Sequence, residues 1–441
     1  MVCAGAAFLL LVALTAEVAS WLGPATDLYS RWYGLRRLLL FGENPYGPAV
    51  TATLASHMPF LTNGVEPAVP REALATAFGF LYPLPGVLFL APLALLPYQA
   101  ALTLWMVAVL ILTPVGAWLV VDATIRRRAS TPIELDPQRL ARRLSLPLGL
   151  LFVPTLANLV HGQLAPAVLF GLALAFWLTR RGVADKGASP LLAGAVLGIA
   201  CAVKPHLVLI VAPCWLGFHL WRWRMVGARE SRGFVLGALG AVVALCALAT
   251  ALAPTWAADF LDAAGAYVSL TRVEYADVTN AVLPGGPAVQ RLLAPFLPSQ
   301  LPLLSWIVAG VVGAGLIAWA VAGWWTADDP EAQGLSRALI ATVLIVPPAW
   351  ETNAVLLLLP LAMQLGRVAR APGPVLALCA LSVLLSALDL PLYATQPWRN
   401  PPLMILAYVA LIGACAGATR LSQARRRFAP APGAVAPFAR G

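Results

Sequence analysis

Apolar runs of roughly 17 to 25 residues recur along almost the whole chain, and short polar segments separate them. Each run is long enough to cross the hydrocarbon core of a bilayer as a helix. Inside lipid the backbone must satisfy its own hydrogen bonds, and a helix does so. The pattern therefore predicts an all-α integral membrane protein with about 12 transmembrane helices.

Composition supports this class. Of the 441 residues, 60% are hydrophobic and 11% are charged, whereas a soluble domain carries about 25% charged residues. The net charge of +10 comes mainly from loops between apolar runs, where positive charge orients helices, so we expect no nucleic-acid partner. The 6 cysteines have no CxxC spacing, which predicts small buried side chains and no disulfide framework or metal site.

The Arg-rich loops predict the orientation, because basic loops stay on the cytoplasmic side. The N-terminus then lies inside, and residues 80–97, which carry four prolines, form a broken juxtamembrane helix at the outer interface rather than a crossing. We expect one membrane domain, residues 1–420, and a cytoplasmic tail, residues 421–441. The large outer loops of the membrane domain are residues 23–98 and 255–301. Arginine in place of nearly all lysine indicates a GC-rich bacterial genome, hence a bacterial inner membrane.

The first outer loop contains the stretch TDLYSRWYGLRRLLLFGENPYG, residues 26–47. The pattern predicts a helix that begins at Thr26-Asp27 and ends at Gly42. Its apolar face would rest on the membrane interface and its arginines would face water and head groups. Asp27 is either a simple helix cap or a functional acid, and spacing alone does not decide between them.

Two tight outer turns carry polar residues that solvation does not explain. The HGQ turn contains His161, and it contains Gln163, whose amide offers a donor and an acceptor. The KPH turn contains Lys204 and His206, and a lysine on the outer side calls for an anionic partner such as a phosphate. The plainer interpretations are local turn hydrogen bonds and a lysine that reaches the head groups.

Other candidates on the outer face are weaker. Arg272 and Arg291 are suited to a bidentate phosphate contact, and Glu351 is either a second acid or an acid favoured by a helix start. The sequence contains no P-loop, no GxGxxG before a helix and no HExxH pair.

In order along the chain, these motifs resemble those of GT-C fold glycosyltransferases. The closest resemblance is to glycosyltransferase family 87, the polyprenyl-phosphate-mannose-dependent α-mannosyltransferases of bacterial envelopes. It rests on residues 26–47, on FLYPLPGVLFLAPLALLP, on HGQLAPAVLF, on the helix that ends in KPH, and on VPPAWETN. The last motif has Glu351, Thr352 and Asn353 where the family usually carries a histidine after the tryptophan.

The resemblance implies a role for each residue. Asp27 would be the base that deprotonates the acceptor hydroxyl, in a single displacement that inverts the anomeric carbon. Residues that would line the donor phosphate and sugar are Lys204, His206, His161, Gln163, Arg272 and Arg291. Acceptor or second-acid candidates are Glu351, Asn353 and Tyr82, and Asn44, Pro45 and Tyr46 would shape the loop.

The resemblance thus implies transfer of a sugar, mannose first of all, from a polyprenyl phosphate to an envelope lipid or glycan on the extracytoplasmic face. We expect no metal and no cofactor besides this lipid-linked donor. Two alternatives remain, a transporter or flippase of lipid-linked sugars and an inactive GT-C relative. Polar residues gathered at one interface favour the enzyme, because a transporter exposes polar groups at mid-membrane.

Overall fold

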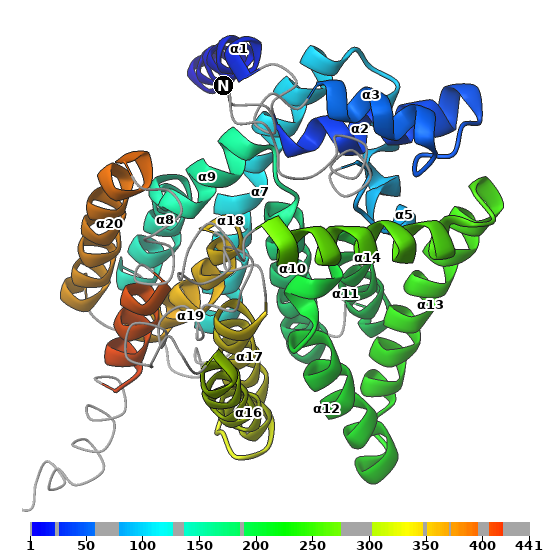
Figure 1. The fold of residues 1–441 in the computed structure, drawn as a ribbon. Helices are drawn as coiled ribbons and strands as arrows, with labels where there is room; N and C mark the ends of the chain where they lie inside the picture. Colours follow the sequence, from blue (N-terminus) through cyan, green and yellow to red (C-terminus); the bar gives the residue numbers. More distant parts are fainter. Residues whose placement is uncertain are drawn as a thin grey trace, which may run out of the picture.

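The described chain is helical throughout. The computed structural model describes residues 2–22, 26–57, 79–126, 136–185, 189–274, 302–346, 351–369, 372–395 and 405–417, and none of these residues forms a strand. Figure 1 shows the helices as one bundle with shorter helices across one end. This agrees with the all-α membrane class.

The N-terminal half consists of α1 (Val2–Leu22), α2 (Asp27–Phe41), α3 (Pro48–Ser56), α5 (Leu84–Val87), η3 (Leu88–Leu90), α6 (Ala91–Ala94), α7 (Tyr98–Arg126), α8 (Asp136–Leu151), α9 (Val153–His161) and α10 (Ala165–Asp185). It is followed by α11 (Pro190–Val203), η4 (Pro205–Val208), α12 (Val211–Val226), α13 (Arg229–Leu252), α14 (Trp256–Glu274), α16 (Pro302–Trp325), α17 (Pro330–Ile345), α18 (Glu351–Ala354), η6 (Val355–Leu357), α19 (Leu358–Val368) and α20 (Pro372–Thr395). A further helix, Ile405–Gly417, follows them.

Long apolar helices confirm the membrane class. Among the described residues, 3 helices are long and apolar enough to cross a bilayer, Tyr98–Ile125, Arg229–Leu252 and Ile307–Trp325. The pair Pro137–Leu151 and Val153–His161, bent by 47°, would make a fourth. Several other apolar helices are shorter, for example Pro190–Val203 and Thr352–Val368. The expected count of about 12 crossings therefore stays a prediction.

Helix α2 has the predicted ends but a different environment. It begins at Asp27, and Gly42 ends it in the left-handed conformation with φ 66°. Its apolar side chains pack inside the protein, where Leu28 and Leu35 are buried. Arg31 is 0% exposed, so the expectation that the arginines of this helix face water is wrong for Arg31. The protein, and not only lipid, covers this helix.

The proline-rich segment 80–97 is broken, as predicted. Its helical part divides into α5, η3 and α6, each three or four residues long. All four residues of α5 are buried. A Cβ atom on Gly86 would overlap the carbonyl oxygen of Ala202. The segment thus packs against the end of α11, just before Lys204.

Small residues hold α11 against α13. A Cβ atom on Gly194 or Gly198 of α11 would overlap a carbonyl oxygen of α13, that of Phe234 or Ala238. Gly237 of α13 meets α11 in the same way. Close backbone approach of this kind is how membrane helices associate, since lipid leaves little hydrophobic drive between them. The seam fixes the position of the end of α11.

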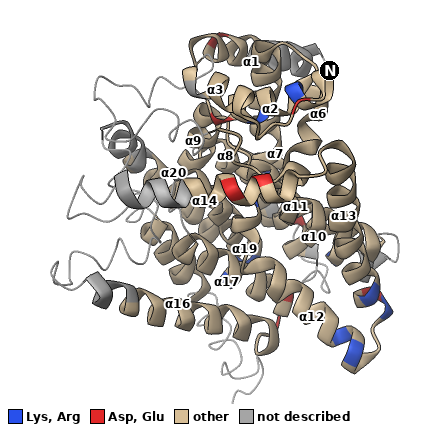
Figure 2. Cartoon of the chain, turned by 45° about the vertical axis from the view of Figure 1, so that its right-hand side comes forward, with Lys and Arg blue, Asp and Glu red and all other residues tan. Residues whose placement is uncertain are grey.

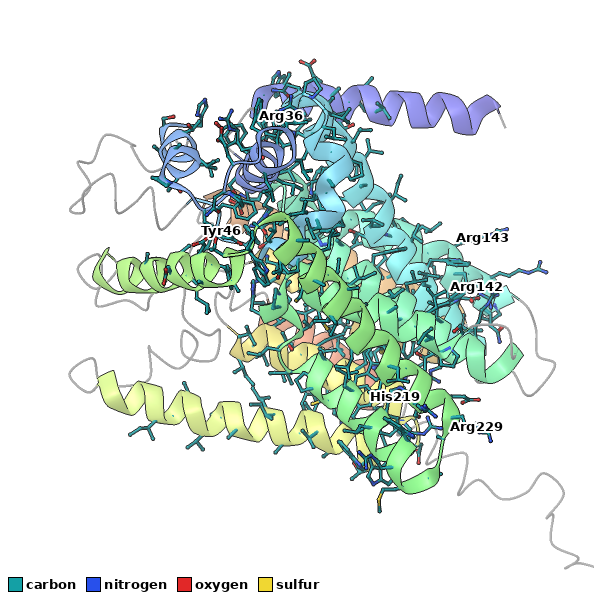
Figure 3. The ribbon with its side chains drawn as sticks, turned by 90° about the vertical axis from the view of Figure 1, so that its right-hand side faces the viewer. Arg36, Tyr46, Arg142, Arg143, His219 and Arg229 are labelled. Carbon is teal, nitrogen blue, oxygen red and sulfur yellow. The ribbon has the colours of Figure 1, made fainter. Side chains whose placement is uncertain are left out.

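One cluster of arginines lies on the side of the bundle away from the short helices α2 and α3, although α2 carries arginines of its own. Figure 2 shows one group of Lys and Arg at the ends of α12 and α13 and another near α2. In Figure 3, Arg142, Arg143 and Arg229 lie on the side opposite Tyr46. On that basic side Arg180 Nη2 pairs with Asp329 Oδ1 at 2.6 Å. The arginines at the ends of α12 and α13 therefore lie at the end of the bundle away from the candidate site.

Candidate active site

The candidate site forms where four helix ends meet. Asp27 is the first residue of α2, Gln163 follows the end of α9, Lys204 follows the end of α11, and Asn353 lies in α18. Two of these helices end at a helix-breaking residue: Gly162 in the left-handed conformation with φ 60° ends α9, and Pro205 follows Lys204 after α11. Four segments that the sequence analysis singled out separately thus come together.

Gln163 is the centre of this cluster and is 1% exposed. Its Oε1 accepts hydrogen bonds from Lys204 Nζ at 3.0 Å and from Arg31 Nη2 at 3.2 Å. Its Nε2 donates to Asp27 Oδ2. The chemistry sets this orientation of the amide, because Lys and Arg only donate and a carboxylate only accepts. One side chain therefore joins the acid to two cations.

Lys204 is a buried cation, 3% exposed. Besides Gln163, its Nζ donates to Asn353 Oδ1 at 3.1 Å. It lies in the break between α11 and α12. Burial and the nearby Arg31 together lower the pKa of Lys204 to about 7, although Asp27 acts in the opposite direction. The ammonium group therefore gains and loses its proton close to neutral pH.

Arg31 is the member of this cluster that sequence reasoning missed. Its Nη1 donates to the carbonyl oxygen of Gly162 at 3.0 Å and its Nη2 donates to the hydroxyl of Tyr82. The guanidinium carbon lies 3.9 Å from the centre of the Tyr82 ring, within cation–π range. The signal was present in the sequence, because Arg31 follows Asp27 by four residues and shares its helix face.

Asp27 does not act as a cap on α2. Thr26 occupies the cap position and makes no side-chain capping bond, and the Asp27 carboxylate instead accepts from Gln163. The half-buried carboxylate faces a site that also holds Arg31 and Lys204. With Lys204 protonated, the cluster carries one more positive than negative charge. Such a site can hold a phosphate beside a carboxylate base.

The two predicted histidines differ in their surroundings. His161 is exposed at the end of α9, whereas the Nε2 atom of His206 is buried without a hydrogen-bond partner in the part of the chain that is described. Burial, Lys204 and Arg31 lower the pKa of His206 to about 3. His206 is therefore neutral at physiological pH, and its role in donor binding stays a prediction.

The Asn-Pro-Tyr loop ties the site to two other elements. Asn44 Nδ2 donates to Asp259 Oδ2 of α14 at 2.8 Å, and Asn44 Oδ1 accepts from the backbone of Tyr46 at 3.0 Å. The Tyr46 hydroxyl donates to the carbonyl oxygen of Tyr82 at 2.5 Å, and Pro45 is buried. Burial raises the pKa of Tyr46, so it remains a neutral donor. The loop thereby holds Tyr82 under Arg31.

Three candidates cannot be placed as side chains. Arg291 lies outside the described residues, and only the backbone is described for Arg272 in α14 and for Glu351 at the start of α18. Asn353, two residues after Glu351, does reach the cluster through Lys204. Among the residues that are described, no group of three His, Cys, Asp or Glu side chains is placed to hold a metal ion. A metal-free site stays a prediction.

Comparison with protein families assigns the chain. The model of Glycosyltransferase family 87 matches residues 80–348, more than half of the chain. The chain belongs to glycosyltransferase family 87. The match includes Tyr82, Gln163 and Lys204, and it begins after Asp27 and Arg31. Searches of the curated proteins and of the solved structures gave no match.

Proposed function

We propose that this family 87 glycosyltransferase moves a sugar, mannose first of all, from a polyprenyl phosphate to a hydroxyl group of an envelope glycolipid or polysaccharide. The reaction takes place at the extracytoplasmic face. Membership of the family implies a lipid-linked sugar donor, and the sugar, the acceptor and the mechanism are our proposal.

The observation that carries the proposal is the buried group of one carboxylate and two cations joined by Gln163. Burying charges is costly unless they are paired, and two cations against one carboxylate leave a place for a further anion. The phosphate of the donor supplies that anion. The neighbouring Asp27 is then close to the bond that breaks.

In the proposed reaction Asp27 takes the proton of the acceptor hydroxyl. The hydroxyl oxygen attacks the anomeric carbon, and the bond between this carbon and the phosphate oxygen breaks with its electron pair on the polyprenyl phosphate. Lys204 and Arg31 stabilise the negative charge of this leaving group. A single displacement inverts the anomeric configuration.

The first test is Asp27→Asn in the full-length protein, assayed for sugar release from polyprenyl-phosphate mannose with an envelope lipid extract. Asparagine is close in size but cannot take a proton, so we expect turnover to fall by about 10²- to 10⁴-fold. Asp262→Asn on the exposed side of α14 is the matched control and should keep wild-type turnover.

Undiminished turnover by Asp27→Asn would remove Asp27 as the base. Movement of the donor across sealed vesicles by a protein without transferase activity would favour the transporter instead. Wild-type protein that neither transfers sugar nor moves the donor would favour the inactive relative. The same preparation can be used for all three readouts.

A further inference from the structure

The Gln163 amide makes two contacts that resemble the contacts of the two substrates. Its Oε1 accepts from the Lys204 ammonium at 3.0 Å and from the Arg31 guanidinium at 3.2 Å. A phosphate oxygen would accept from the same donors. Its Nε2 donates to Asp27 Oδ2, as an acceptor hydroxyl must do before it loses its proton.

The same position cannot serve the amide and both substrates at once. Gln163 is 1% exposed, Asn353 is 3% exposed and Arg31 is 0% exposed, so the amide occupies the enclosed space between the acid and the cations. An amide group is planar and rigid, and its two ends turn together about the terminal side-chain torsion. Displacement of Oε1 from the cations therefore also moves Nε2 relative to Asp27.

We propose that Gln163 is a built-in substitute for both substrates. The donor phosphate displaces its amide from the cations, and this displacement releases the Asp27 carboxylate for the acceptor hydroxyl. This inference rests on the proposed function and extends it. The base becomes available only when the donor is bound, so the donor binds first. Without the donor, the amide keeps Asp27 occupied and the buried cations paired.

The consequence for affinity has a definite sign. A ligand that must displace an internal group binds more weakly by the fraction of molecules in which its site is open. Removing the amide while keeping the side-chain length should strengthen phosphate binding. Replacing the amide with a carboxylate should weaken phosphate binding, because a charged oxygen holds the two cations more firmly.

The test compares wild type, Gln163→Met and Gln163→Glu, three side chains of similar length, in full-length protein in nanodiscs. Isothermal titration measures the Kd of farnesyl phosphate, with farnesol as the ligand that lacks the phosphate. Removal of one hydrogen-bond acceptor for charged donors should lower the Kd in Gln163→Met by about ten-fold, and Gln163→Glu should raise the Kd by a similar factor. Farnesol should bind all three proteins equally.

Opposite shifts in the two variants support the inference, because a purely structural role of Gln163 would weaken binding in both. Binding by Gln163→Met that is equal to or weaker than that of wild type overturns the inference and leaves the proposed function intact. Absence of phosphate-dependent binding in all three proteins overturns the phosphate site and the inference together.

Discussion

At the residue scale, the main feature of the site is that it buries two cations close to a single carboxylate. Lys204 and Arg31 lie in one enclosed cluster, and neutral oxygens of Gln163, Asn353 and Gly162 surround them. These oxygens satisfy the hydrogen-bond donors but carry no net charge. Within this cluster, the carboxylate of Asp27 therefore offsets only one of the two positive charges. The lowered pKa of Lys204 is the physical sign of this imbalance, since burial and a neighbouring cation both disfavour its charged form.

This imbalance predicts proton uptake when an anionic ligand binds. The pKa of Lys204 is about 7, so at pH 8 most molecules carry a neutral amine. A phosphate nearby raises this pKa toward its ordinary value, and up to about one proton should enter per farnesyl phosphate bound. Titration calorimetry at pH 8 in buffers of different ionisation enthalpy measures this number.

The sign follows from the direction of the shift. Affinity for the phosphate should fall as pH rises above about 7, because the free enzyme must then take up a proton to bind. In Lys204→Met the uptake should vanish and the affinity should lose this pH dependence. Proton uptake that persists in Lys204→Met would assign the titrating group elsewhere.

At the element scale, helix ends rather than helix interiors make the site. The end of α11 carries Lys204, and two sets of contacts hold it, α5 through Gly86 and α13 through Gly194 and Gly198. These are backbone-to-backbone approaches, so they tolerate no side chain. The position of the cation therefore depends on Gly86, which lies far from it along the chain, and on two glycines of the helix that it follows.

Gly194→Ala should separate α11 from α13, because the new methyl group would overlap the carbonyl oxygen of Phe234. Overpacking of this kind costs about 1–3 kcal/mol, and it should lower the apparent melting temperature and the affinity for farnesyl phosphate together. Gly240→Ala on the open side of α13, where a Cβ atom meets nothing within 4 Å, is the matched control. Equal melting temperatures of the two variants would contradict a tight seam.

At the scale of the whole molecule, one cluster of arginines lies at the end of the bundle away from the candidate site (Figures 2 and 3). The last turn of α12 and the first turn of α13 contain Arg222, Arg224, Arg229 and Arg232, whereas the site lies with α2 and the Asn-Pro-Tyr loop. Positive loops stay in the cytoplasm. The site end should therefore face away from the cytoplasm, on the side at which we propose that sugar transfer takes place.

Labelling of single cysteines in a background without native cysteines tests this orientation. Ala49→Cys on the exposed side of α3 and Met225→Cys, at a position that is 72% exposed on α12, lie toward the two ends. In intact cells an impermeant maleimide should label only Ala49→Cys. After permeabilisation the maleimide should label both variants. Labelling of Met225→Cys alone in intact cells would show the opposite orientation of the protein in the membrane.

The apolar pattern was enough to determine the helical membrane class and the start and stop of α2, because these follow from local hydrophobicity and from Gly42. The break before Pro205 was equally local. The pattern also singled out Asp27, Gln163 and Lys204 separately, each as an unusual polar residue at an outer turn. None of these signals depends on how the helices pack.

Only the tertiary structure decided that these residues form one cluster. Gln163 lies 136 positions from Asp27 along the chain, and no local pattern encodes such a contact. For the same reason the inward position of Arg31 could not be predicted: whether a helix face meets lipid or protein depends on the elements that cover it. Here α6 and the segment around Tyr82 cover α2, and they turn an arginine that was expected at the surface into part of the site.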